Sequence, residues 1–133
     1  MTSPVAGLIH HVELWVPDLE RAVDSWGWLL TELGYQPFQR WVHGVSFRLG
    51  PAYVVLERSP DLVADGHERC RAGLNHLAFH AASPDQVDQV AADGPAHGWT
   101  LLFPDRHPHA GGPDQYAAYL ENADGYEVEI VAP

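Results

Sequence analysis

Histidines and carboxylates are the residues of this sequence best suited to chemistry. Nine of its 133 residues are histidine, whereas cysteine occurs once, as Cys70. A cysteine-based zinc site is therefore excluded, which leaves imidazole nitrogens and carboxylate oxygens as metal ligands. Two histidines and one carboxylate lie in separate strand-like segments: His11, His76 and Glu129. Such a set suits a divalent ion such as Mn, Fe, Ni, Co or Zn.

The segment around His11 predicts a strand, because residues 8–16 alternate in polarity and are rich in β-forming residues. Successive side chains of a strand point to opposite faces, so His11, Glu13 and Trp15 share one face. The other face holds the aliphatic residues Val12, Leu14 and Val16. We expect the aliphatic face to pack on a helix. This leaves His11 on a face open to polar chemistry, with Glu13 as a candidate base and Trp15 as a candidate substrate contact.

The segment around His76 repeats this pattern. Residues 74–81 predict a strand in which His76, Ala78 and His80 share one face. Leu77 and Phe79 share the other face. Each of the two segments therefore directs a histidine away from its aliphatic side.

The carboxylate of Glu129 belongs to a predicted hairpin over residues 115–131, which turns at Asn122-Ala-Asp-Gly. With this turn, Glu121 lies opposite Glu127 and Tyr119 opposite Glu129, and directly opposed residues share a face. A carboxylate on an inward sheet face is costly to bury unless it is paired or bound to a cation. Glu129 is therefore expected to have a positively charged partner, and Tyr119 to lie beside it.

An earlier hairpin gives Glu57 the corresponding place in the first half of the chain. Residues 44–49 and 52–57 flank Gly50-Pro51, and a two-residue turn there creates an apolar face from Leu49, Ala52, Phe47, Val54, Val45 and Leu56. The opposite face holds Arg48, Ser46, Tyr53, Val55 and Glu57. Glu57 is thus the first-half counterpart of Glu129.

The order of elements repeats along the chain. Each predicted strand is followed by a predicted helix, residues 19–33 after Asp18 and residues 86–96 after Ser83-Pro84-Asp85. His76 follows His11 by 65 residues, and the helix-closing Gly98 follows Gly34 by 64. We therefore expect one domain with modules at 8–57 and 74–133, joined by a polar, aperiodic linker at 58–73. Two such halves would also suit a ferredoxin-like domain.

Composition narrows the classes of partner. The sequence has 7 Lys and Arg against 18 Asp and Glu, a net charge of −11, which repels nucleic acid and anionic membranes. A single cysteine allows no intramolecular disulfide and fits a reducing cytoplasm. The sequence shows neither a signal-like segment nor an apolar run of membrane-spanning length, so we expect a soluble, cytoplasmic protein.

Three motifs resemble those of the vicinal oxygen chelate superfamily, which includes glyoxalases, fosfomycin and bleomycin resistance proteins and ring-cleaving dioxygenases. They are HVELWVPDLERA from His11, NHLAF from Asn75 and NADGYEVEI from Asn122. Ala123 replaces a usual proline in the third motif. The resemblance covers nearly the whole chain. Within the superfamily, the chain is most similar to small glyoxalase-like members with no assigned reaction.

The resemblance implies an α+β fold of two tandem βαβββ modules, a homodimer, and a divalent metal held by His11, His76 and Glu129. In such proteins the metal binds two oxygens of a small-molecule substrate or intermediate. Glu57 would be a fourth ligand and general base, as in glyoxalase I-like members, or a rim residue, as in fosfomycin thiol transferase-like members. Tyr119 corresponds to a position that often contacts substrate.

Two further predictions depend on this resemblance. The Gly- and Pro-rich segment 105–113 is expected to form a lid or rim, with His107 and His109 as candidate substrate contacts. The predicted function is a metal-dependent lyase, isomerase or thiol transferase of glyoxalase-like type. The alternatives are a metal-free drug-binding protein of the bleomycin-binding type and a small ring-cleaving dioxygenase, since two histidines and a carboxylate are also an iron(II) set.

Overall fold

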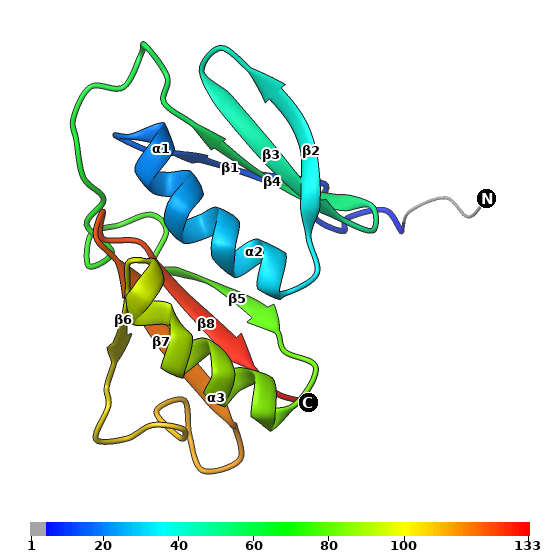
Figure 1. Cartoon of the computed structure of the whole chain (residues 1–133), viewed down its shortest axis with the longest axis vertical. Coiled ribbons are helices and arrows are strands. Elements are labelled where there is room, and N and C mark those ends of the chain that lie inside the picture. The colour runs from blue at the N-terminus through cyan, green and yellow to red at the C-terminus, as the bar shows by residue number, and fades with distance from the viewer. Residues whose placement is uncertain (1–4) are drawn as a thin grey trace. The chain divides into compact units, whose positions relative to one another are not determined.

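The computed structural model describes residues 5–133, which form two compact units that meet between Asp65 and Gly66 (Figure 1). This boundary falls inside the aperiodic segment 58–73. Each unit contains one four-stranded sheet and its own helical segment. In the described part of the chain, no helix is both long enough and apolar enough to cross a membrane.

The first unit is a βαβββ arrangement. Its elements are β1 (His11–Trp15), α1 (Leu19–Ala22), the π-helical turn η1 (Val23–Gly27), α2 (Trp28–Glu32), β2 (Gln36–Trp41), β3 (Gly44–Leu49) and β4 (Ala52–Glu57). The strand order is β1-β4-β3-β2, with β1 parallel to β4 and the other neighbours antiparallel. A helical run therefore connects β1 to the three-stranded meander.

The helical run of the first unit confirms the predicted helix over 19–33. Asp18 caps its start by accepting a hydrogen bond from the backbone N–H of Arg21, and Gly34 follows its end with a φ of 99°. The apolar side chains on its inner side are fully buried: Ala22, Trp26, Leu29 and Leu30. These residues cover one face of the sheet.

The register of the first sheet follows the predicted hairpin. Leu49 pairs with Ala52, Phe47 with Val54 and Val45 with Leu56. The apolar side chains of the last two pairs are buried, whereas Leu49 is exposed. In β1, Leu14 is buried between the exposed Glu13 and Trp15, as its alternation predicts. One face of this sheet therefore packs on the helical run. The opposite face, here called the open face, carries the polar side chains, although Ser46 and Val55 on it are also buried.

One strand of this sheet is absent from the residue-based prediction. Strand β2 lies at the sheet edge and its residues are almost all exposed, so it lacks the polar–apolar alternation of a half-buried strand. It also contains Pro37, and its pairing with β3 shifts register between Pro37 and Arg40. Proline and bulges are typical of edge strands, where a missing N–H leaves no partner unsatisfied.

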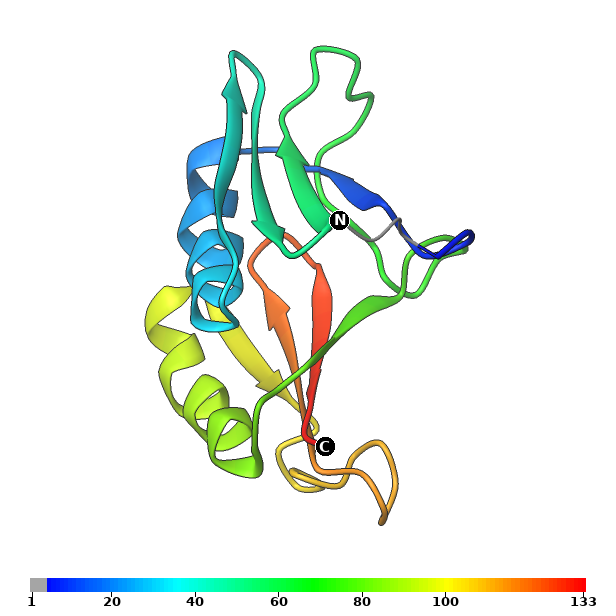
Figure 2. The ribbon, with the colours of Figure 1, turned by 90° about the vertical axis from the view of Figure 1, so that its right-hand side faces the viewer.

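The second unit repeats the same topology. Its elements are β5 (His76–His80), α3 (Pro84–Asp93), the 3-10 turn η2 (Gly94–His97), β6 (Trp99–Leu102), β7 (Ala117–Asn122) and β8 (Glu127–Val131). The order is β5-β8-β7-β6, with β5 parallel to β8. Figure 2 shows α3 along one face of this sheet, while the opposite face carries no helix of its own unit. The predicted α+β class with two βαβββ modules is confirmed.

The second hairpin also has the predicted register. Tyr119 pairs with Glu129 and Glu121 with Glu127. Ser83 caps α3 by accepting a hydrogen bond from the N–H of Gln86, with Pro84 in the first turn. The core between α3 and the sheet is made of fully or nearly fully buried residues: Val87, Val90, Trp99, Leu120, Val128 and Ile130.

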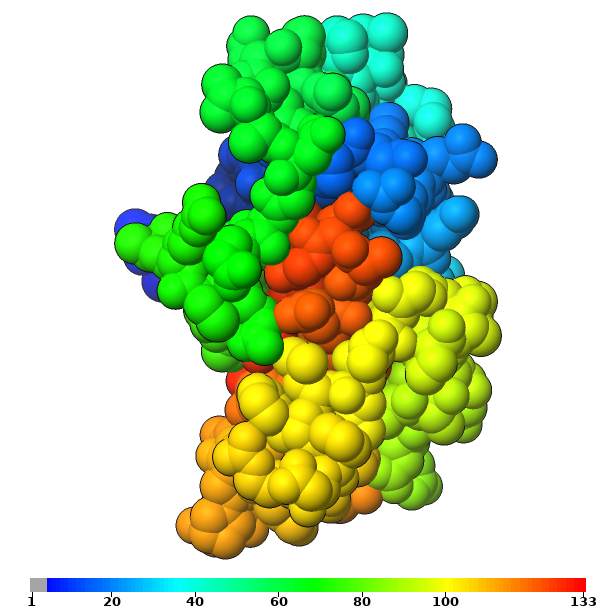
Figure 3. All heavy atoms as spheres, turned by 90° about the vertical axis from the view of Figure 1, so that its left-hand side faces the viewer, coloured from blue at the N-terminus to red at the C-terminus, as the bar shows by residue number. Residues whose placement is uncertain are grey.

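The chain that enters the second unit packs against the β7–β8 turn. The backbone N–H of His67 donates to the carbonyl of Asp124 over 3.1 Å, and the His67 ring stacks on Tyr126 with ring centroids 4.5 Å apart. Figure 3 shows this green segment directly beside the orange turn. Part of the polar segment 58–73 therefore has fixed contacts although it contains no regular element.

Candidate metal centre

The open face of the second sheet gathers the polar residues of three neighbouring strands. His76 of β5 lies opposite Glu127 of β8, which in turn lies opposite Glu121 of β7. One row further along, Glu129 lies opposite Tyr119. Period-2 alternation and strand register thus bring one imidazole, three carboxylates and one phenol to a single face.

Two of the three predicted metal ligands meet on this face. Nε2 of His76 lies 3.2 Å from Oε1 of Glu129, and the carboxylate is nearly buried, with 10% of its side chain exposed against 32% for His76. Glu129 therefore has the positively ionisable partner that its burial requires.

Asn75 decides which nitrogen of His76 carries a hydrogen. Its amide Nδ2 donates to the carbonyl of Arg69 over 3.0 Å, so its Oδ1, 2.7 Å from Nδ1 of His76, is the atom that faces the ring. An amide oxygen only accepts, and therefore Nδ1 is the donor. In the neutral ring, Nε2 then presents a lone pair to the carboxylate of Glu129.

Two acceptor atoms that face each other require a cation, either a proton on His76 or a metal ion. Bonds of about 2.0–2.2 Å from one ion to a nitrogen and an oxygen separate neighbouring ligand atoms by about 3.0–3.5 Å. The observed 3.2 Å between His76 and Glu129 lies in this range. The residues therefore fit a divalent ion, and the hydrogen bond from His76 to Asn75 is the kind of support that metal-binding histidines have.

Tyr119 borders this pair. Burial raises the pKa of its hydroxyl above the usual value, and the charge of Glu129 and a hydrogen bond to it raise the pKa further. The hydroxyl therefore stays protonated at neutral pH and donates a hydrogen bond to the carboxylate of Glu129. The loop between β6 and β7 passes close to it, since a Cβ added at Gly111 would lie 2.6 Å from the Tyr119 hydroxyl oxygen.

The first unit places His11 in a hollow on its own open face. The hollow has a volume of about 550 Å³ and is lined by His11, Glu13, Gln39, Arg40, Trp41, Tyr53 and Val55. The His11 ring stacks on Tyr53 with centroids 4.8 Å apart, and its Nδ1 lies 2.9 Å from Nδ1 of His10. The contacts with Tyr53 and His10 thus hold the His11 ring beside a hollow that is large enough for a small molecule.

The other predicted residues of the first unit are held by tryptophans. Glu13 accepts a hydrogen bond from the indole N–H of Trp15 over 2.7 Å. Glu57, which lies opposite Trp15 in the sheet, accepts one from Trp41 over 2.9 Å through its Oε1. One oxygen of each carboxylate is therefore oriented, and the second oxygen of Glu57 is left for another partner.

The predicted ligands are divided between the two units. His11 and Glu57 belong to the first, whereas His76 and Glu129 belong to the second. Among residues 5–133, no three histidine, cysteine, aspartate or glutamate side chains are gathered as a ready metal site. The second unit by itself brings together two of the predicted ligands, His76 and Glu129.

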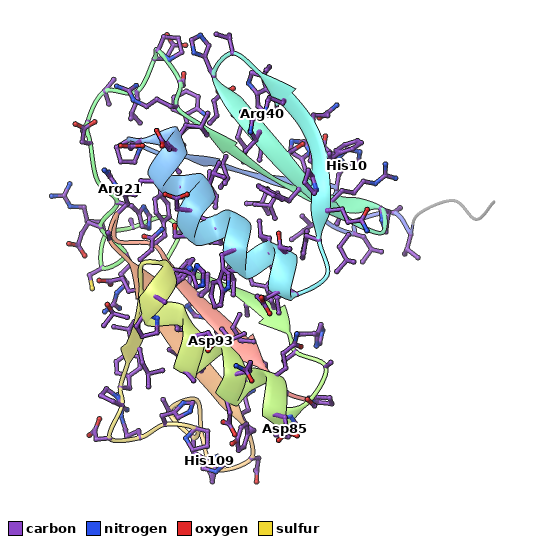
Figure 4. All side chains as sticks on the ribbon, in the orientation of Figure 1. His10, Arg21, Arg40, Asp85, Asp93 and His109 are labelled. Carbon is purple, nitrogen blue, oxygen red and sulfur yellow. The ribbon has the colours of Figure 1, made fainter. Side chains whose placement is uncertain are left out.

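The predicted rim histidines contact the far end of the second unit. His107 Nε2 lies 3.9 Å from Asp88 of α3, and His109 Nδ1 lies 2.9 Å from the carbonyl of Gln115. His109 is labelled on its loop in Figure 4. Their role in substrate binding stays a prediction.

Sequence reasoning missed the residues that support the site. Asn75 was visible as the neighbour of His76 in the NHLAF motif, and Tyr53 as a residue of the open face. Trp41 lies on the unpredicted strand β2, and Arg69 lies in an aperiodic segment. Only Asn75 and Tyr53 therefore had a signal in the sequence.

Comparison with known proteins agrees with this architecture. The pattern of the Glyoxalase/Bleomycin resistance protein/Dioxygenase superfamily matches residues 10–119. The chain belongs to this superfamily. The uncharacterized protein YqjT of Bacillus subtilis (strain 168) is 48% identical over 127 residues, which cover 94% of this chain and 98% of YqjT.

Solved structures give the same assignment. A candidate glyoxalase from Bacillus halodurans has a TM-score of 0.90 and 45% identity, covering 96% of this chain and 97% of its own. A glyoxalase/bleomycin resistance protein from Albidiferax ferrireducens T118 has a TM-score of 0.77 and 26% identity, with coverage of 96% and 99%. The superfamily includes enzymes and commonly binds metal, so membership establishes a fold and a range of chemistry.

Proposed function

We propose that this superfamily member is a divalent-metal-dependent enzyme of glyoxalase-like type that acts on a small molecule. The observation that carries the proposal is the meeting of His76 and Glu129, whose facing acceptor atoms lie 3.2 Å apart. A metal ion bound there would act as a Lewis acid on two oxygens of the substrate. Manganese, iron, nickel, cobalt and zinc are the ions that suit such a donor set.

The proposed ligands are His76 and Glu129, completed by His11 from the first unit. Asn75 supports the set because it fixes the ring tautomer of His76. In the homodimer that the family resemblance implies, His11 would come either from the same chain or from the second copy. The hollow beside His11 would hold the substrate.

Glu57 is the proposed general base or fourth ligand. Its Oε1 accepts the Trp41 N–H, so the carboxylate is held in one orientation and its other oxygen remains available. Glu13 is the second candidate base in the same unit, and Trp15 and Tyr119 are candidate substrate contacts. These residues suit proton transfer or nucleophilic addition at a metal-bound oxygen pair, as in lyases, isomerases and thiol transferases.

A second function has its own structural support. The hollow of the first unit is lined by the aromatic side chains of Trp41 and Tyr53 beside the imidazole of His11. A hollow that combines aromatic rings with the polar side chains of Glu13, Gln39 and Arg40 can hold a flat ligand with polar groups without chemistry. A metal-free binding protein that sequesters a small molecule is therefore the alternative proposal.

Metal content of the untagged protein distinguishes the two functions. Each of Mn, Fe, Ni, Co and Zn is loaded separately, excess ion is removed, and the retained metal is measured by mass spectrometry. We expect stoichiometric retention in the wild type, and loss in His76→Ala and in Glu129→Gln. His80→Ala is the matched control, because His80 lies on the same strand and the same face. It should retain the ion.

The result for His11→Ala tests the assignment of the third ligand. A weakened but measurable retention is expected, with His43→Ala, an exposed histidine of the same unit, as control. Failure of the folded wild type to retain any ion would remove the metalloenzyme proposal and favour the sequestering function.

A further inference from the structure

The open face of the second sheet holds more carboxylates than one metal ion needs from it. Glu121, Glu127 and Glu129 all lie on this face, within two rows of the register. Glu127 is directly opposite His76 on one side and Glu121 on the other. By strand pairing alone, Glu127 is the carboxylate closest in register to the imidazole.

Arg69 holds the two carboxylates that do not contact His76. Its Nε lies 2.7 Å from Oε2 of Glu121, and its Nη1 lies 3.0 Å from Oε1 of Glu127. Glu127 is 4% exposed, so its charge is almost fully removed from water and needs this partner. The contact with Glu121 is a hydrogen bond, whereas the contact with Glu127 is an ion pair without hydrogen-bond geometry.

These ion pairs are consistent with the contact that His76 makes with Glu129 instead of with Glu127, its partner in register. With Glu127 held by Arg69, the Nε2 of His76 meets Glu129, which lies two residues further along β8. A buried carboxylate that lost its cationic partner would turn to the nearest other cation. At the proposed metal centre, that cation would be the metal ion.

We propose that Arg69 is a positioning residue that selects the metal ligands of the second unit. It holds Glu127 and Glu121 in an ion-paired cluster and so keeps them out of the ligand set, which leaves Glu129 as the carboxylate that meets His76. This inference rests on the metal-binding function proposed above.

The backbone of Arg69 is tied to the same site. Its carbonyl accepts the hydrogen bond from Nδ2 of Asn75, whose Oδ1 faces His76. The segment that carries Arg69 is anchored a few residues earlier, where the N–H of His67 donates to Asp124. The guanidinium is thus placed by a segment with fixed contacts at both ends.

The test compares four variants with the wild type. Arg69→Met removes the guanidinium and keeps the apolar stem, and Arg71→Met is its control, because Arg71 is an exposed arginine of the same segment. Glu127→Gln removes the charge of the sequestered carboxylate. The double variant Arg69→Met/Glu127→Gln asks whether any effect of the first change operates through Glu127. Affinity for Mn²⁺ and for Ni²⁺ is measured by titration, and the visible spectrum of the Co²⁺ form reports the coordination number.

An additional carboxylate ligand favours ions that prefer oxygen, such as Mn²⁺. Arg69→Met is therefore expected to raise Mn²⁺ affinity about tenfold relative to Ni²⁺ and to change the Co²⁺ spectrum in the direction of a higher coordination number. The double variant should return both to wild-type values. Arg71→Met and Glu127→Gln alone should bind within about twofold of the wild type, since neither changes the ligand set.

Two results would overturn the inference while leaving the metal function intact. One is a loss of about tenfold or more in affinity in Glu127→Gln, which would make Glu127 a ligand. The other is a folded Arg69→Met that binds every ion as the wild type does. If Arg69→Met does not fold, Arg69→Gln, which removes the charge and keeps a polar side chain, takes its place in the same titrations with the same expected and overturning results. A wild type that binds no ion removes both proposals, and this outcome is seen without any variant.

Discussion

His76 meets Glu129 diagonally across two parallel strands, although the sheet register places Glu127 opposite His76. The contact joins residues on neighbouring rows, so it depends on side-chain direction as well as on strand pairing. On one side the imidazole is hydrogen-bonded to Asn75, and Glu127, its partner in register, is ion-paired with Arg69. The candidate centre is therefore defined by its supporting residues as much as by its ligands.

Removal of the hydrogen bond from Asn75 is expected to weaken metal binding. Asn75→Ala leaves Nδ1 of His76 without its acceptor, so the ring can rotate or change tautomer. Loss of such a partner typically lowers affinity about 10- to 100-fold. Asn75→Asp keeps an oxygen acceptor and should retain most of the affinity. Titration with the preferred ion measures both variants, and equal binding by Asn75→Ala would show that His76 needs no support from Asn75.

Removal of the cap of the first helix should destabilise the protein by a modest amount. Asp18 accepts the N–H of Arg21 over 2.9 Å and also pairs with the guanidinium of Arg21 over 3.2 Å. Asp18→Ala is expected to lower the free energy of unfolding by about 1 kcal/mol, because a backbone N–H loses its acceptor. Asp18→Asn keeps the cap and loses only an exposed ion pair, so it should stay within about 0.5 kcal/mol of the wild type. Urea unfolding measures both, and equal losses would assign the effect to the ion pair.

Much of the fold was predictable because half-buried strands carry a period of two. The alternation around His11 and Glu129 gave the correct faces, and the turn residues gave the correct pairing of Tyr119 with Glu129. Helix starts were visible at Asp18 and Ser83 because their side chains accept backbone N–H groups. These signals are local, so a single sequence contains them.

The remaining features depend on contacts that the sequence does not express locally. Strand β2 is an exposed edge strand with a bulge, and its pattern resembles that of a loop. Arg69 lies in an aperiodic segment, 52 residues before Glu121, and only the folded chain brings the two together. The pairing of His76 with Glu129 was expected from the family motifs, but the ion pairs that Arg69 makes with the neighbouring carboxylates were not.

The β7–β8 turn should tolerate no side chain at Gly125. This glycine has a φ of 88°, and a Cβ there would collide with the carbonyl oxygen of His67. Gly66 is a matched control, because its φ is 83° and an added Cβ would meet nothing within 4 Å. Gly66→Ala is expected to cost about 1 kcal/mol for the left-handed backbone alone, and Gly125→Ala about 1–3 kcal/mol more for the overlap. Equal losses in urea unfolding would show that the segment around His67 moves away from the new side chain at no measurable loss of stability.

Alkaline pH should destabilise the second unit through Tyr126. This side chain is 7% exposed, and its burial raises the pKa of the hydroxyl, with a further contribution from the charge of Asp124. In the unfolded chain a tyrosine ionises at about pH 10. Between that pH and the higher folded pKa, the unfolded state loses its proton first, so the free energy of unfolding falls as pH rises. Below about pH 10 the stabilisation is fully present.

Tyr126→Phe tests this assignment because phenylalanine keeps the ring that stacks on His67 and has no ionisable group. Loss of the hydroxyl contact changes the free energy of unfolding by an offset that is the same at every pH below about 10, where the tyrosine is protonated in both states. From about pH 10 upward its free energy of unfolding should fall less steeply than that of the wild type. Urea unfolding at a series of pH values gives both slopes, and parallel curves above pH 10 would place the alkaline sensitivity in other residues.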